Sequence, residues 1–157
     1  ILDHALPAPA IKKLASNSPR RRDILKTIIG LAPDIIPSPF EEDLSPASFA
    51  DIHEYPVATA SHKAVEVYER LVLRAEDPDN APDLIIAADT VQTDYTFLPS
   101  VGQELLEKPK DEEDNLRMIM DLNAQLCEVV IGVTIAYPIL AAPGYALHSI
   151  DERSLIY

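Results

Sequence analysis

A continuous apolar run at residues 84–88 (LIIAA) constrains the fold of this 157-residue chain more than any other feature. A strand that is buried on both faces reads as an unbroken apolar run, whereas a strand with one wet face alternates with polar residues. The run therefore predicts a central strand that is covered on both sides.

Strand and helix patterns alternate along the rest of the chain. Apolar residues recur at three- and four-residue spacing over 54–74, which predicts the longest helix. Two more helices are predicted, beginning at Pro19 and spanning 112–122. Four more strands are predicted, at 11–15, 34–37, 127–137 and 145–157, with loops at 75–82 and 93–104. Pro143-Gly144 predicts a hairpin turn, and the element order predicts an α/β fold with a mixed twisted sheet and flanking helices.

Length and composition limit the classes of protein and partner. A chain of 157 residues suits one domain, so we expect residues 1–157 to form a single domain. Acidic residues outnumber basic ones 26 to 13, and this excess argues against binding to nucleic acid. No apolar run reaches the roughly 18 residues that a membrane span needs, and no secretory signal is visible. The single cysteine, Cys127, excludes an internal disulfide and fits a cytoplasmic location.

A local basic cluster stands out on this acidic chain. Six of the 13 basic residues fall within 12–26, around the stretch Ser16-Asn17-Ser18-Pro19-Arg20-Arg21. Ser18 suits the N-cap of the predicted helix, and Pro19 suits its first position. Free N–H groups, hydroxyls and forked guanidinium groups together predict a site for a polyphosphate. The alternative is an ordinary capped helix with solvated arginines.

Acidic residues follow two of the predicted strands. Glu41-Glu42-Asp43 follows the strand at 34–37, and clustered carboxylates can hold Mg²⁺. Asp89-Thr90 directly follows the apolar run, and an Asp at a strand end can bind metal or take a proton from water. The alternatives are a solvated acidic loop and an Asp89 that caps a turn.

Other candidates carry weaker signals. Lys63, within the long helix, and Lys108, before Pro109, could each reach a phosphate, although lone lysines are usually solvated. The four histidines lack metal-ligand spacing, and Cys127 is expected to pack as a small hydrophobe. The chain contains no Walker loop, dinucleotide fingerprint or serine nucleophile elbow.

In this order, the motifs resemble those of the Maf family from about residue 11 onward. The matching segments are Leu14-Ala15-Ser16-Asn17-Ser18-Pro19-Arg20-Arg21, Glu41-Glu42-Asp43-Leu44, Ala60-Ser61-His62-Lys63-Ala64, Ala88-Asp89-Thr90-Val91 and Glu107-Lys108-Pro109. The resemblance implies a Maf/inosine-triphosphatase-like fold with a cleft between two lobes. It also implies hydrolysis of a nucleoside triphosphate to the monophosphate and pyrophosphate, with Mg²⁺ or Mn²⁺ as cofactor. Formation of a homodimer is left open.

The resemblance also implies roles for individual residues. Asp89 would accept the proton and, with Glu41, hold the metal. The residues expected around the substrate are Ser16, Ser18, Arg20, Arg21, Lys63, Thr90 and Lys108. Arg20 and Thr90 match the subfamily that acts on dTTP and UTP, which predicts those or modified pyrimidine triphosphates as substrates.

The chain departs from the family pattern at several positions. Ala87 and Ala124 stand where Gly is usual, Asn123 where Ser is usual, Cys127 where His is usual and Ile131 where Thr is usual. The C-terminal part of the family domain, which carries a substrate-selecting glutamine, is expected to be absent. Two alternatives to an enzyme follow: a non-catalytic nucleotide-binding or regulatory module of the same fold, and an acidic interaction domain with inherited motifs.

Overall fold

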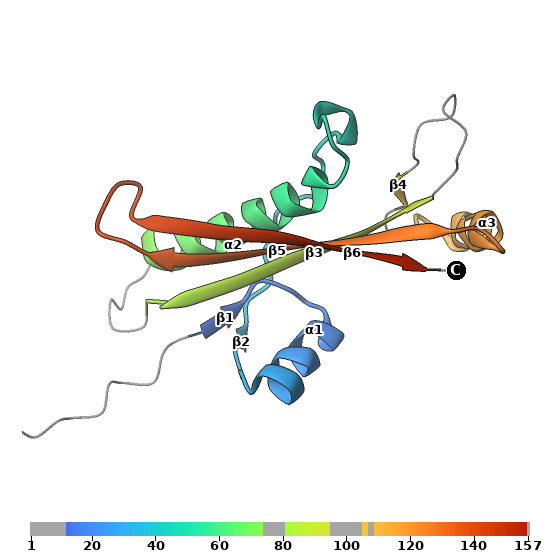
Figure 1. The fold of residues 1–157 in the computed structure, drawn as a ribbon. Coiled ribbons are helices and arrows are strands. Elements are labelled where there is room, and N and C mark those ends of the chain that lie inside the picture. Colours follow the sequence, from blue (N-terminus) through green and yellow to red (C-terminus); the bar gives the residue numbers. More distant parts are fainter. Residues whose placement is uncertain (1–11, 74–80, 95–104, 107–108, 157) are drawn as a thin grey trace, which may run out of the picture. The chain divides into compact units, whose positions relative to one another are not determined.

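The computed structural model of the protein describes residues 12–73, 81–94, 105–106 and 109–156 (Figure 1). Its helical elements are α1 (Pro19–Ile24), the π-helical turn η1 (Leu25–Ile29), the 3-10 turn η2 (Pro46–Ser48), α2 (Glu54–Leu73) and α3 (Glu112–Leu122). Its strands are β1 (Lys12–Leu14), β2 (Asp34–Ile35), β3 (Leu84–Asp94), β4 (Leu105–Leu106), β5 (Cys127–Pro138) and β6 (Tyr145–Ile156). Among these helices, none is long and apolar enough to cross a membrane.

The strands form one mixed six-stranded sheet, in the order β2-β1-β3-β5-β6, with β4 paired to β3. β1 runs parallel to both β2 and β3, whereas β4 runs antiparallel to β3. The predicted turn between β5 and β6 is closed by the Ile139 N–H, which donates to the Gly144 carbonyl at 3.0 Å. The predicted α/β fold with a mixed sheet is therefore confirmed.

The chain divides into two compact units, and α2, β3, β5 and β6 each contribute residues to both. The first unit comprises the described residues of 1–40, 63–87 and 135–148. The second comprises the described residues of 41–62, 88–134 and 149–157. The single domain over 1–157 and the cleft implied by the family resemblance stay predictions.

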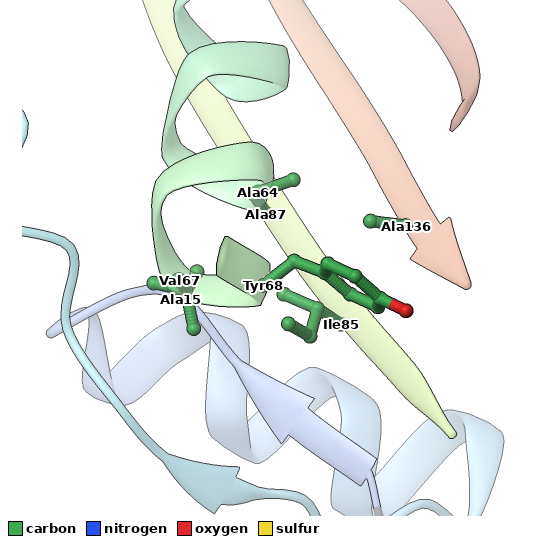
Figure 2. Packing of buried hydrophobic residues seen from close by; sticks show 7 residues of the cluster. All are labelled: Ala15, Ala64, Val67, Tyr68, Ile85, Ala87 and Ala136. Atoms are coloured by element: carbon green, nitrogen blue, oxygen red, sulfur yellow. The ribbon is translucent and has the colours of Figure 1, made fainter. Parts of the chain in front are cut away.

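The core of the first unit joins one face of α2 to the strands (Figure 2). Ala64 lies three and four residues before Val67 and Tyr68 on α2, and the three pack with buried residues in the strands or directly after β1. The other members of this cluster are Ala15, Ile85, Ala87 and Ala136. The departure from glycine at Ala87 is thus accommodated, since the added methyl group belongs to the core.

The core of the second unit centres on Tyr55, Val91 and Val130. The Phe49 ring meets the Tyr55 ring edge-on, with 5.7 Å between centroids. Gly132 of β5, two residues after Val130, lies against the first turn of α2. A Cβ atom added to Gly132 would lie 2.4 Å from the Pro56 carbonyl carbon, so only glycine permits this backbone contact.

The predicted end of the central strand was wrong. The prediction ended the strand at residue 88 and began a loop at 93, but β3 continues to Asp94. Asp89, Val91 and Thr93 are buried at alternate positions, and Gln92 and Thr93 pair with β4. The polar residues Thr90 and Gln92 fall between them. The length of the strand was therefore underestimated, because the apolar run covers only its first half and the second half alternates between buried and more exposed residues. Residues 95–104 lie outside the described residues.

Smaller differences occur at other boundaries. The predicted strand at 34–37 is shortened to Asp34–Ile35, because Pro37 has no N–H to donate to a ladder. The helix predicted to begin at Pro19 does so, and it passes into η1, which ends at Gly30 with φ of 73°.

We expect Gly132→Ala to destabilise the protein by about 3 kcal/mol, because the methyl group would overlap backbone atoms that cannot rotate away. Urea unfolding followed by circular dichroism measures the free energy of unfolding. A variant within about 0.5 kcal/mol of the parent would contradict the contact with Pro56.

We expect Ala124→Gly to stabilise the protein by about 1 kcal/mol. Ala124 has φ of 58°, a left-handed conformation that costs energy for any residue with a Cβ. Ala58→Gly, within α2, is the control and should destabilise by a similar amount. Equal effects of the two substitutions in urea unfolding would contradict the strain at Ala124.

Candidate functional site

The loop between β1 and α1 is held by its own side chains. Ser18 is the N-cap of α1, and its Oγ accepts from the Arg21 N–H at 3.4 Å, as predicted. The buried Ser16 Oγ accepts from the Ser18 N–H at 3.1 Å and from Arg21 Nη1 at 3.3 Å. These bonds leave the Ser16 hydroxyl proton available to donate. The loop therefore combines a donor hydroxyl with an oriented guanidinium group.

The arginines of this loop differ in their surroundings. Arg21 is half-buried and bound to Ser16, whereas Arg20 is exposed on the first turn of α1. Arg22 pairs with the neighbouring Asp23 at 3.4 Å, and both side chains are more than half exposed. Beside the cap, Arg20 is thus an exposed cation and Arg21 a half-buried one.

Lys63 is buried, so the solvated alternative for this lysine is wrong. Its neighbour Ala64 packs in the same cluster as Ala15, which directly precedes Ser16. The segment that carries Lys63 and the loop that carries Ser16 are therefore joined to the same core cluster of the first unit. Lys108 lies outside the described residues.

Asp89 and Thr90 lie within β3 and not after it, which corrects the predicted position at a strand end. The alternative in which Asp89 caps a turn is wrong for the same reason. The pairing of β3 with β1 reaches Ile86, whose carbonyl accepts from the Ala15 N–H at 2.8 Å, and pairing with β4 begins at Gln92. Asp89 is buried, whereas Thr90 is exposed.

Glu41 is exposed and begins the acidic segment, which we define as Glu41-Glu42-Asp43. The segment leads to Leu44, which packs against the cluster that contains Val91. Glu41 precedes Leu44 by three residues, and three residues of extended chain reach about 10 Å. Glu41 therefore lies within about 10 Å of Leu44. The cluster that Leu44 contacts contains Val91, which follows Asp89 by two residues. The shared metal site of Glu41 and Asp89 stays a prediction.

The carboxylates suit one kind of metal binding and not another. Within the described part of the chain, no group of three or more His, Cys, Asp or Glu side chains could hold a metal ion. A structural cage of the zinc type is therefore absent from those residues. Mg²⁺ is usually held by one or two carboxylates together with substrate phosphates and water, and Glu41 and Asp89 supply oxygen ligands of that kind.

His53 lies at the centre of a hydrogen-bond network that was not predicted from the sequence. Its Nε2 pairs with Glu128 Oε2 at 2.7 Å, and its Nδ1 pairs with Asp51. The His53 backbone N–H also donates to Asp51, and this bond is the main reason that the pKa of Asp51 is lowered. Only the short Asp51-Ile52-His53 spacing could have indicated the turn, because Glu128 is 75 residues away.

Cys127 is buried, as predicted, and its Sγ accepts from Gln92 Nε2 at 3.1 Å. The sulfur also lies 3.7 Å from the Ile156 carbonyl oxygen. This cysteine therefore joins β3, β5 and β6 within the second unit.

Comparison with known proteins decides the family. A family model described as Maf-like protein matches residues 13–153. The chain belongs to the Maf-like family. The matched range contains all the motifs that suggested the resemblance, and it includes residues of both compact units.

Individual relatives of this Maf-like chain cover most of its length. The human probable bifunctional dTTP/UTP pyrophosphatase/methyltransferase protein is 42% identical over 124 residues, which cover 79% of this chain and 18% of the relative. The dTTP/UTP pyrophosphatase of Thermococcus kodakarensis is 39% identical over 124 residues, 79% of this chain and 56% of the relative. That of Schizosaccharomyces pombe is 29% identical over 147 residues, 91% of this chain and 56% of the relative. The chain thus spans about half the length of the archaeal and yeast relatives.

We expect Ser18→Ala to destabilise the protein by about 1 kcal/mol, because the capping bond to the Arg21 N–H is lost. Ser45 offers a matched control, since it also precedes a proline at a helix start but makes no side-chain cap bond. Ser45→Ala should therefore change the free energy of unfolding little. Equal losses for the two variants in urea unfolding would contradict the capping role of Ser18.

Proposed function

We propose that this Maf-like chain is a nucleoside triphosphate pyrophosphatase acting on dTTP, UTP or modified pyrimidine triphosphates. The observation that carries the proposal is the loop in which Ser16, Ser18 and Arg21 hold one another beside the exposed Arg20. Hydroxyl and guanidinium donors gathered at one turn suit a polyphosphate chain. The names of the human, archaeal and yeast relatives support the pyrimidine substrate.

The phosphate contacts are assigned to basic and hydroxyl side chains. Arg20 and Arg21 would bind phosphate oxygens through forked donors, and Lys63 and Lys108 would do so as point charges. Ser16 and Ser18 would donate from their hydroxyl groups, and Thr90 would contact the substrate from the exposed face of β3. Lys63 supports the proposal by its place on α2, because its neighbour Ala64 packs in the same cluster as Ala15, which directly precedes Ser16.

The hydrolytic step is assigned to Asp89. Its carboxylate would take a proton from water as the oxygen attacks phosphorus in line, and the bond to the pyrophosphate leaving group would break. Glu41 and Asp89 would hold a divalent cation, Mg²⁺ or Mn²⁺, which offsets negative charge on the phosphates when it is bound. Burial of Asp89 supports the assignment, because a shielded carboxylate interacts more strongly with nearby charges than a solvated one does.

The setting of the protein is proposed from its composition. The free, buried Cys127 fits a reducing compartment, and we propose a cytoplasmic location. The net charge of −13 fits a small anionic ligand bound at a local basic cluster better than it fits binding to nucleic acid. A homodimer stays an open alternative to a monomer.

A second candidate is a nucleotide-binding or regulatory module without turnover. Ala124 favours this candidate. It has a left-handed backbone conformation at a position where the family usually has Gly, so the chain departs there from the family pattern. Nucleotide binding without release of pyrophosphate from any common triphosphate would identify such a module. Binding is detectable as a rise in melting temperature with added nucleotide.

We expect Asp89→Asn to lower turnover of dTTP or UTP at least about 100-fold while nucleotide affinity changes little. Asn has the size of Asp but cannot accept the proton or offset the charge of a metal. Pyrophosphate release and calorimetric nucleotide binding give the two quantities. Asp121→Asn on α3 is the matched control, because its exposed pair with Arg117 contributes little. Turnover of Asp89→Asn at the parent's rate would show that the mechanism is wrong.

We expect Arg20→Ala to have the opposite pattern, with nucleotide affinity reduced about tenfold and turnover at saturating substrate less affected. The substitution removes a forked phosphate contact but leaves Asp89 in place. The same two measurements apply, with Arg22→Ala as the control because Arg22 already pairs with Asp23. Similar losses of affinity in both variants would point to general charge and not to a contact at Arg20.

A further inference from the structure

Three side chains of the first unit hold the segment that leads into the acidic segment. On α2, Arg70 Nε donates to Glu66 Oε1 at 2.9 Å, a pair at i,i+4 spacing. Arg70 Nη2 also donates to the Pro37 carbonyl at 2.9 Å, and the Ser38 hydroxyl donates to Glu66 Oε2 at 2.9 Å. We call Ser38, Glu66 and Arg70 the clasp.

The clasp completes a series of contacts along consecutive residues. The Ile36 N–H donates to the Leu14 carbonyl at 3.0 Å and so fixes the chain to β1 just after β2. Pro37 and Ser38 are then held by Arg70 and Glu66. The Phe40 N–H donates to Ser38 Oγ at 3.1 Å, and the next residue is Glu41. The chain is thus held at nearly every position up to the first residue of the acidic segment.

An exposed run of three carboxylates needs such an anchor if it is to bind a cation. The Asp43 N–H donates to the Glu41 carbonyl at 2.8 Å, but the three exposed carboxylates repel one another in the absence of a cation. Ordering them on binding costs conformational entropy, and a chain that is fixed at its first residue loses less. Leu44 holds the other end through its packing against the cluster of Tyr55, Val91 and Val130.

We propose that Glu66 and Arg70 are positioning residues for the acidic segment, acting through Ser38 and the Pro37 carbonyl on the metal ligand Glu41. The inference rests on the proposed function, since it needs a cation at Glu41. Glu66 acts indirectly, because its two oxygens already accept from Ser38 and Arg70.

A purely structural pair would look different. An isolated Glu–Arg pair at i,i+4 spacing on a helix is usually solvated and contacts only its own helix. Here the two side chains are 28% and 31% exposed, and they contact residues 28 and 33 positions earlier in the sequence. The contacts are therefore directed at one loop, the loop that continues into Glu41.

The test compares Glu66→Gln with Glu69→Gln. Glu69 is exposed on the same helix, so the second variant makes the same change of charge away from the clasp. Ser38→Ala is a milder variant that removes only the hydroxyl link. Mn²⁺ affinity is measured by electron paramagnetic resonance well below the melting temperature, both without nucleotide and with a non-hydrolysable UTP analogue. Amide hydrogen exchange of residues 38–43 is measured on the metal-free protein.

We expect Glu66→Gln and Ser38→Ala to weaken Mn²⁺ binding about tenfold, the low end of losses caused by groups that orient metal ligands. Exchange at residues 38–43 should be faster in both variants, and Glu69→Gln should match the parent in both measurements. Faster exchange with unchanged Mn²⁺ affinity would overturn the proposal and leave the clasp a structural contact. Unchanged exchange in Glu66→Gln would overturn it as well. A parent that binds no Mn²⁺ either alone or with the triphosphate analogue would refute the metal site of the proposed function itself, and this inference with it.

Discussion

Helix α2 packs against the strands through small side chains, and most of the proposed site depends on that packing. In the first unit, Ala64 packs in the cluster that holds Ala15 and Ala87, where larger residues would push helix and strands apart. In the second unit, Gly132 allows backbone contact with Pro56 in the first turn of α2. The same helix carries Lys63, Glu66 and Arg70. A shift of α2 would therefore displace Lys63, a proposed phosphate contact, together with the clasp residues Glu66 and Arg70.

Polar groups near the proposed site are held by other polar groups and not by burial alone. Ser16 accepts two hydrogen bonds in its loop, and Glu66 accepts from both Ser38 and Arg70. Each of these side chains is thereby restricted to few rotamers, which lowers the entropy lost when a ligand binds. The arrangement fits a protein whose ligand is small, highly charged and in need of several oriented donors.

The local features of the site could be predicted from the sequence, and the features made by distant segments could not. Ser18 and Pro19 mark the helix start because the capping bond spans three residues. The length of β3 was underestimated, since its second half is stabilised by pairing with Leu105 and Leu106. Likewise, neither the contact of His53 with Glu128 nor that of Glu66 with Ser38 leaves a signal in sequence spacing.

The sequence by itself determined the α/β class, the main helices and the family, because apolar periodicity, capping residues and motifs act over a few neighbouring positions. Only the tertiary structure decided that Lys63 is buried, that Asp89 lies inside a strand and that the chain before Glu41 is clasped to α2. These outcomes depend on which segments pack together. Burial and long-range hydrogen bonds belong to that packing and not to the residue or its neighbours in the chain.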